Sequence, residues 1–216
     1  MIATHRARVK TEQFDIRPGA VLWRSLLDHK EQRALLDEIM PRVAEAPFFR
    51  PSMPRTGKPF SVEMTNFGAL GWVSDRANGY RYQSCHPVTG TIWPDIPPIL
   101  LRLWERTSRY PFLPEACLVN LYRGSARMGL HQDRDEAALD ASVLSISLGD
   151  DAVFRIGGVE RGAPTSAFAL KSGDVLLMGG PARLCRHGID RIVAASSDLL
   201  PGGGRINLTL RRVRHT

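Results

Sequence analysis

Residues 205–211 read RINLTLR, a strict alternation of polar and apolar side chains. Successive side chains of a strand point to opposite faces of its sheet. One face of this segment therefore carries three aliphatic residues, and the other carries Arg205, Asn207, Thr209 and Arg211. Two guanidinium groups on one strand face suit a ligand that has two carboxylates. A solvated polar face is the alternative, because antiparallel sheets often have one.

The second half of the chain has the character of a β-protein. Short apolar or alternating segments, separated by glycine- and serine-containing turns, predict strands at 116–122, 143–148, 152–156, 167–170, 174–178 and 205–213, and another at 20–24. Strands at this spacing are typical of a β-sandwich or a double-sheet jelly roll. In the predicted strand 116–122, Asn120 and Tyr122 share one face.

Two helices are predicted in the first half. Asp28 followed by Glu31 forms a capping box, and the apolar residues that follow recur at helical spacing. We expect Pro41 to interrupt this helix. Pro97 and Pro98 suit the start of a second helix. Residues 47–98 are rich in proline and aromatic residues and lack helical periodicity, so we interpret them as strands and loops that form a lid over a site.

Composition limits the class of protein. The chain has 216 residues, which suits one domain with an insertion, and a formal net charge of +7, which favours a polyanion such as nucleic acid. A merely soluble basic protein is the alternative. Three dispersed cysteines favour a reducing cytoplasm, and no stretch is long and apolar enough to suggest a membrane span. Nothing indicates an oligomeric interface, so a monomer is expected.

A His-x-Asp motif is the clearest candidate for a metal site. In extended chain His131 and Asp133 point the same way, and a second histidine, His187, follows several strands later. Two histidines and one carboxylate are the ligand set of non-haem Fe(II) oxygenases. Structural roles remain open for each residue taken singly: His131 as a loop histidine paired with Asp133, and His187 as a half-buried histidine.

These motifs together resemble the AlkB family of Fe(II)/2-oxoglutarate dioxygenases. The resemblance covers roughly Phe14 to Val213 and rests on segments 120–122, 130–136, 179–189 and 205–211, with 64–72 upstream. It implies a mainly β (α+β) fold: a double-stranded β-helix, or jelly-roll, core with N-terminal helices and a nucleotide-recognition lid. The expected division is a basic arm at 1–13, an extension at 14–115 with the lid at about 47–98, and the core at 116–213.

The resemblance also implies an activity and a set of site residues. The activity is oxidative demethylation of bases such as 1-methyladenine and 3-methylcytosine in DNA, with RNA as a second possibility, using Fe(II), 2-oxoglutarate and O2. The implied residues are His131, Asp133 and His187 for iron, Asn120, Tyr122, Arg205, Asn207 and Arg211 for 2-oxoglutarate, and Trp72, Tyr80, Asp135, Arg161 and Met64 for the nucleotide. Which arginine takes which carboxylate stays open.

Some positions depart from the family pattern. Cys185 and Arg186 stand before His187, where aromatic residues are expected, and Met178 stands where a tryptophan is common. One extra residue falls between Trp72 and Tyr80. Two rival functions also remain: an iron-dependent hydroxylase of a protein or small molecule, and a nucleic-acid-binding jelly roll without catalysis. The latter has no use for the predicted iron ligands.

Overall fold

The computed structural model describes residues 12–215. Its helices are α1 (His29–Glu45) and α2 (Pro98–Ser108), with a short 3₁₀ helix at Gly180–Ala182. Its strands are β1 (Glu12–Arg17), β2 (Ala20–Arg24), β3 (Glu63–Phe67), β4 (Gly71–Asp75), β5 (Gly79–Gln83), β6 (Ala116–Tyr122), β7 (Met128–His131), β8 (Val143–Gly149), β9 (Asp151–Ile156), β10 (Ser166–Leu170), β11 (Val175–Met178), β12 (His187–Val193) and β13 (Arg205–Arg211).

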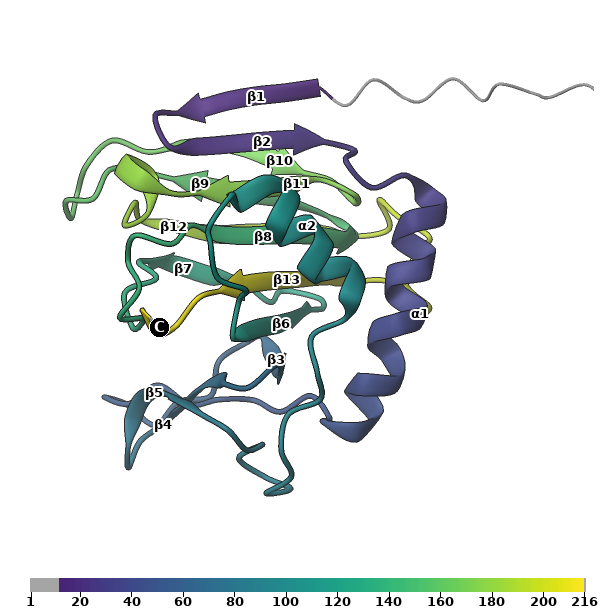
Figure 1. Cartoon of the computed structure of the whole chain (residues 1–216), viewed down its shortest axis with the longest axis vertical. Coiled ribbons are helices and arrows are strands. Elements are labelled where there is room, and N and C mark those ends of the chain that lie inside the picture. The colour runs from purple at the N-terminus through teal and green to yellow at the C-terminus, as the bar shows by residue number, and fades with distance from the viewer. Residues whose placement is uncertain (1–11, 216) are drawn as a thin grey trace, which may run out of the picture.

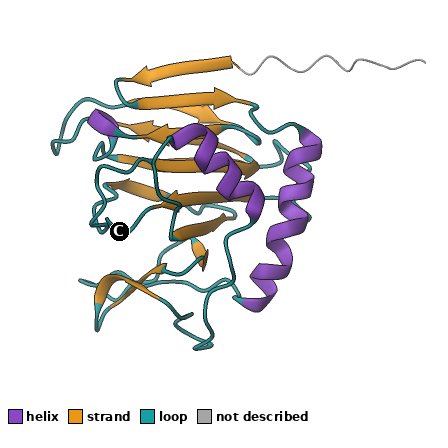
Figure 2. Ribbon diagram, viewed as in Figure 1, coloured by secondary structure: helices purple, strands orange, loops and turns teal. Residues whose placement is uncertain are grey.

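Two antiparallel sheets form the body of the molecule. The larger has the strand order β1-β2-β11-β8-β13-β6-β3, and the smaller has the order β10-β9-β12-β7. A separate hairpin, β4–β5, lies at the lower left of Figure 1. In the same view α2 lies in front of the strands and α1 runs along their right-hand side. Figure 2 shows the same division by element type. This arrangement confirms the predicted mainly β, jelly-roll fold class.

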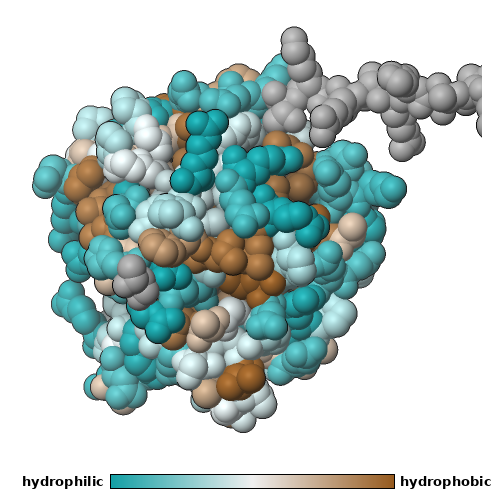
Figure 3. Space-filling model, viewed as in Figure 1, coloured by the Kyte–Doolittle hydropathy of each residue, from teal (hydrophilic) through white to brown (hydrophobic). Residues whose placement is uncertain are grey.

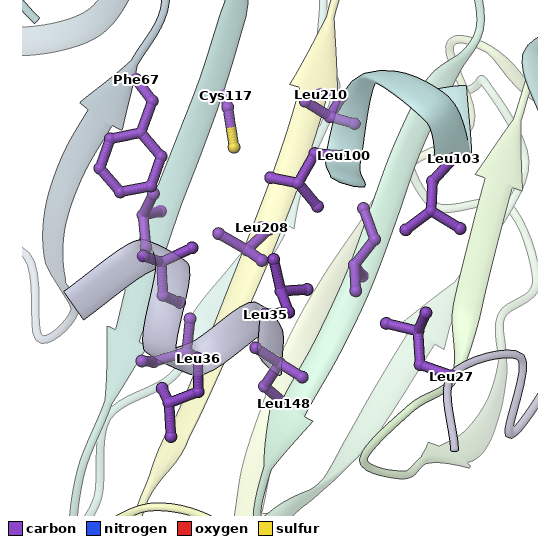
Figure 4. Close-up of a cluster of buried hydrophobic side chains, with 14 of the residues drawn as sticks. Leu27, Leu35, Leu36, Phe67, Leu100, Leu103, Cys117, Leu148, Leu208 and Leu210 are labelled. Carbon is purple, nitrogen blue, oxygen red and sulfur yellow. The ribbon is translucent and has the colours of Figure 1, made fainter. Parts of the chain in front are cut away.

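The alternation in β13 separates two hydrophobic clusters. Ile206, Leu208 and Leu210 pack against the helices in the first cluster, which also contains Leu35 of α1 and Trp104 of α2. Figure 4 shows leucines from both helices converging on this face of the sheet. The second cluster joins the two sheets through residues of β6, β9, β11 and β12. The polar face of β13 therefore points between the sheets and not into solvent.

Helix α1 starts as predicted and continues further than predicted. Asp28 accepts a hydrogen bond from the Glu31 backbone N–H, and the Glu31 side chain accepts one from the Asp28 backbone N–H. The expected break at Pro41 was wrong, since the helix runs through it to Glu45. Pro41 lies on the exposed side, where water can bond the carbonyl that loses its partner. The buried side, from Leu35 to Val43, holds the helix on the sheet.

The predicted strands are present with boundaries shifted by at most two residues, and α2 begins at Pro98. Strand β1 begins at Glu12, within the expected basic arm at 1–13, and the rest of that arm, residues 1–11, lies outside the described part. The lid region contains β3, β4 and β5 and no helix before α2, as its pattern predicted. The division at residue 115 stays a prediction, but β1, β2 and β3 of the extension hydrogen-bond into the large sheet and help to build it.

The surface and helix lengths give further limits. Within residues 12–215, neither helix is long and apolar enough to cross a membrane. The face that carries the helices is largely hydrophilic, with hydrophobic groups gathered near its centre (Figure 3).

The packing of α1 makes a prediction about stability. Ile39 is fully buried against the sheet, whereas its neighbour Met40 is 46% exposed. Ile39→Ala should lower the free energy of unfolding by about 2–5 kcal/mol, because it leaves a cavity. Met40→Ala should change it by less than about 0.5 kcal/mol. Urea titrations followed by far-UV circular dichroism measure both, and equal losses would show that the orientation of α1 is wrong.

Candidate active site

Strand pairing brings the two predicted metal-binding histidines together. Strands β7 and β12 are antiparallel neighbours, and His131 lies directly opposite His187 in their register. The ring centroids are 4.5 Å apart. Gly188 permits this approach, because a Cβ atom there would lie 2.4 Å from the Met128 carbonyl oxygen. The pairing of β7 and β12, which sequence patterns did not predict, is therefore what assembles the site.

Asp133 completes a cluster of three possible metal ligands. The ligand atoms of His131, Asp133 and His187 all lie within 4.8 Å of one another. His131 Nδ1 lies 2.9 Å from the Gly129 carbonyl oxygen, and His187 Nδ1 lies 3.0 Å from that of Cys185. A carbonyl only accepts, so each Nδ1 carries the proton. Each Nε2 is then left with a free lone pair on the side of Asp133.

Burial and charge prepare these groups for a cation. Burial, with a smaller contribution from nearby His131, lowers the pKa of His187 to about 4, so this ring is neutral at physiological pH. Burial by itself raises the pKa of Asp133. The charge and hydrogen bond of Arg211, together with the two histidines, outweigh burial and hold that pKa well below its usual range. The cluster therefore presents one carboxylate, the neutral imidazole of His187 and the Nε2 atom of His131.

Arg211 joins the cluster to a buried polar network. Its Nη2 lies 2.9 Å from Asp133 Oδ2, and its Nε lies 3.4 Å from Glu136 Oε1. Glu136 also pairs with Arg183 at 3.0 Å and accepts a hydrogen bond from Tyr82 of the lid. No alternation or spacing signal could have identified Tyr82 and Arg183 as partners, since they come from distant segments.

The second predicted group lines a cavity between the two sheets. Asn120 and Tyr122 of β6 lie beside Arg205, Asn207 and Arg211 of β13, and the three possible metal ligands line the same space. We call this the inter-sheet cavity. All five residues thus share one space, as the strand faces predicted. Asn207 donates to Ser145 at 2.7 Å, a partner that the sequence did not indicate.

Arg205 is the unusual member of this cavity. It is fully buried and has no carboxylate within ion-pair distance among residues 12–215. Its Nη2 donates to Ser147 at 2.7 Å, but its Nε has no acceptor, and Asn120 Oδ1 likewise has no donor. Burial lowers the pKa of Arg205 to about 10, which still leaves it charged at neutral pH. A buried cation of this kind calls for an anionic ligand.

The lid covers a larger opening on the other side of the ligand cluster. This lid pocket has a volume of about 350 Å³ and is lined by Met64, Trp72 and Tyr80 of the lid and by Asp135 of the core. Trp72 and Tyr80 stack with centroids 5.4 Å apart, and Trp72 Nε1 donates to Asp135 at 2.8 Å. The volume falls within the range of small-ligand sites. Four of the five predicted nucleotide residues therefore meet here.

Arg161 is the exception among the predicted site residues. It lies exposed in the turn that follows β9 and lines neither the inter-sheet cavity nor the lid pocket. Its predicted contact with a nucleotide stays a prediction.

The lid pocket also includes Phe60, Gln132 and Arg186, which were not predicted as site residues. Gln132 is held by the Leu184 carbonyl at 2.7 Å, a contact between segments that sequence patterns do not connect.

Three comparisons with known proteins agree with this geometry. The profile of the 2OG-Fe(II) oxygenase superfamily matches residues 19–211. The chain is 55% identical to an alpha-ketoglutarate-dependent dioxygenase AlkB homolog from Caulobacter vibrioides, covering 99% of this chain and 96% of that protein. It is 38% identical to the alpha-ketoglutarate-dependent dioxygenase AlkB of Escherichia coli, covering 93% of each.

A solved structure described as that of OsALKBH1 superimposes with a TM-score of 0.82 and 30% sequence identity, covering 93% of this chain and all of the other. Together these similarities confirm the resemblance drawn from the motifs. Enzymes of this superfamily use Fe(II), 2-oxoglutarate and O2, which confirms the expected cofactors. The chain therefore belongs to the AlkB family of Fe(II)/2-oxoglutarate-dependent dioxygenases.

Proposed function

We propose that this protein oxidatively demethylates alkylated bases in DNA, and in RNA as a second substrate. One observation carries the proposal. His131, Asp133 and Arg211 line both the inter-sheet cavity and the lid pocket, so the ligand cluster lies where a cosubstrate space and an aromatic substrate space meet. An oxidant formed at that junction would reach a group held against Trp72.

The ligand cluster fits Fe(II). Its members are two imidazoles and a carboxylate, and the Nδ1–carbonyl contacts leave each Nε2 on the side of the carboxylate. This donor set leaves coordination positions free for a cosubstrate and oxygen. We assign His131, Asp133 and His187 as the iron ligands. Arg211 does not bind the metal itself but donates a hydrogen bond to one oxygen of Asp133 and so orients this ligand.

The inter-sheet cavity fits 2-oxoglutarate. Arg211 is already paired with Asp133 and Glu136, whereas Arg205 has no carboxylate partner among the described residues. We therefore assign the carboxylate remote from iron to Arg205. Asn120, Tyr122 and Asn207 line the space between and supply polar groups. The strand pattern left open which arginine binds which carboxylate of 2-oxoglutarate, and this is the assignment that we propose.

When bound, iron and 2-oxoglutarate supply oxidation by O2, giving succinate and CO2, and the oxidised methyl group is lost as formaldehyde. The protein's own part is to bind and orient. Burial of Arg205 and Tyr122 keeps water from competing for the cosubstrate. Glu136 and Asp133 hold Arg211 from two sides, so that its guanidinium stays in one position.

The lid pocket suits a methylated base. A target base must leave its stack to reach the site, and this costs least when methylation has already weakened pairing. Bases methylated at adenine N1 or cytosine N3 are cationic, and the face of Trp72 attracts cations. The Trp72 ring is oriented by the hydrogen bond to Asp135 and by an edge contact with Phe60. Asp135 adds a negative charge beside it.

The wider setting supports this activity. A net charge of +7 favours binding to a polyanion. Cys85, Cys117 and Cys185 are all free thiols, which is consistent with the cytoplasmic location that we propose. We further propose that the enzyme acts as a monomer.

The direct test is release of formaldehyde from oligonucleotides that contain 1-methyladenine or 3-methylcytosine. The enzyme with Fe(II), 2-oxoglutarate and O2 should release one formaldehyde per methyl group removed. Asp133→Ala should abolish both release and binding of Fe(II) measured by equilibrium dialysis. Asp198→Ala, at an exposed position, is the control. Turnover of 2-oxoglutarate that no methylated oligonucleotide stimulates would favour the rival hydroxylase of a protein or small molecule.

The assignment of Arg205 predicts a change in cosubstrate binding. Arg205→Gln removes the charge that faces the remote carboxylate, and a hydrogen bond between charged groups contributes about 1.5–3 kcal/mol. The KM for 2-oxoglutarate should therefore rise by roughly 10- to 150-fold. The same change at exposed Arg123 should have little effect. Unchanged KM and kcat in Arg205→Gln would remove this residue from the cosubstrate site.

The charge of Asp135 predicts base selectivity. Asp135→Asn keeps an oxygen that can accept from Trp72 but removes the negative charge. The preference in kcat/KM for cationic 3-methylcytosine over neutral 3-methylthymine should fall by about tenfold, which corresponds to about 1.4 kcal/mol. Competition assays with mixed oligonucleotides measure this ratio. A preference that stays at the wild-type level would show that Asp135 acts only through its bond to Trp72.

A further inference from the structure

Arg186 lines the lid pocket together with the aromatic residues of the lid. It immediately precedes β12 and His187. Two backbone hydrogen bonds fix its position: its N–H donates to the Gly158 carbonyl at 3.1 Å, and its carbonyl accepts from Gly157 at 2.8 Å. The side chain thus starts from a rigid point beside the ligand cluster.

The guanidinium of Arg186 has no partner among residues 12–215. The residue is half-buried, and its Nε is buried without an acceptor. No carboxylate lies within ion-pair distance of it in that part of the chain. Buried donors in folded proteins nearly always have an acceptor. An arginine placed in this way in a pocket wall is suited to an acceptor that the ligand brings.

The acids of the lid pocket do not supply that acceptor. Asp133 and Glu136 are engaged by Arg211, and Glu136 also by Arg183. Asp135 accepts from Trp72 Nε1. Each carboxylate that lines the pocket therefore already has a donor, and Arg186 remains as uncompensated positive charge.

The proposed substrate determines what Arg186 can bind. A methylated nucleotide brings a cationic base and anionic phosphodiesters on either side of it. A guanidinium repels the base and attracts the phosphates. Its Nε and Nη edge also matches two phosphate oxygens, which accept in parallel. Because the side chain is only half-buried, it can meet a phosphate at the mouth of the pocket while the base lies deeper.

We propose that Arg186 binds a phosphodiester group adjacent to the extruded methylated base. The proposal rests on the function proposed above and deepens it. Arg186 then selects a nucleotide within a strand over a free nucleoside, while Trp72 and Asp135 select the base. This role explains an arginine at a position where the family resemblance suggests an aromatic residue.

The test measures binding without turnover, in the enzyme loaded with Mn(II) and the unreactive analogue N-oxalylglycine. The probes are a trinucleotide with central 1-methyladenine, the same trinucleotide with one or the other linkage replaced by an uncharged methylphosphonate, and free 1-methyladenosine. Isothermal titration calorimetry gives the affinities. Arg186→Gln is compared with the wild type and with Arg102→Gln, an exposed change on α2, which packs on the face of the large sheet remote from the inter-sheet cavity.

Neutralising one of the two linkages should weaken wild-type binding by about tenfold. Arg186→Gln should bind the fully charged trinucleotide about tenfold more weakly than wild type and should be insensitive to that same linkage. Its affinity for 1-methyladenosine should be unchanged, and Arg102→Gln should behave as wild type. The slope of log affinity against log salt should also become shallower in Arg186→Gln, by about 0.7 for one phosphate contact on a single strand.

Two results would overturn the proposal. One is an equal loss of affinity for trinucleotide and nucleoside in Arg186→Gln, which places the residue at the base or in the fold. The other is full retention of the methylphosphonate effect in that variant. Failure of the proposed function has a different signature: wild-type enzyme would then release no formaldehyde and bind methylated and unmethylated trinucleotides equally.

Discussion

The buried ion pair between Arg211 and Asp133 is the interaction on which the rest of the site depends. It joins the end of β13 in the large sheet to the turn that follows β7 in the small sheet. Removing one partner of a buried pair leaves an uncompensated charge, at a cost of about 3–5 kcal/mol. The pair therefore holds Asp133 against the two histidines, and it holds the two sheets in the spacing that the inter-sheet cavity requires.

The same interaction reaches the lid through consecutive acids. Asp135 accepts from Trp72, and Glu136 accepts from Tyr82. Trp72 and Tyr82 lie directly opposite each other in the β4–β5 hairpin. Since Glu136 also contacts Arg211, the hairpin is linked to Asp133 by a continuous chain of polar contacts. Displacing the lid would disturb that chain. The substrate wall and the ligand cluster are in this sense one mechanical unit.

Pairing distinguishes the roles of the buried arginines. Arg183 and Arg211 have carboxylate partners within the protein and hold the site together. Arg205 and Arg186 each have an Nε without an acceptor and line cavities of the same site. A charge that the fold leaves uncompensated is costly unless a ligand compensates it. Arg183 and Arg211 thus stabilise the site, whereas Arg205 and Arg186 are available to bind anions.

The sequence by itself determined the faces of the strands, the capping box at Asp28 and the family, and it predicted the candidate site residues. These follow from local rules, because alternation, capping and motif spacing depend on neighbours along the chain. Only the tertiary structure decided that α1 continues through Pro41, that β7 pairs with β12, and that Arg211 is paired whereas Arg205 and Arg186 are not. Those outcomes depend on which distant residues come within a few ångströms, and hydrophobic patterning specifies a face without naming the partner that packs against it.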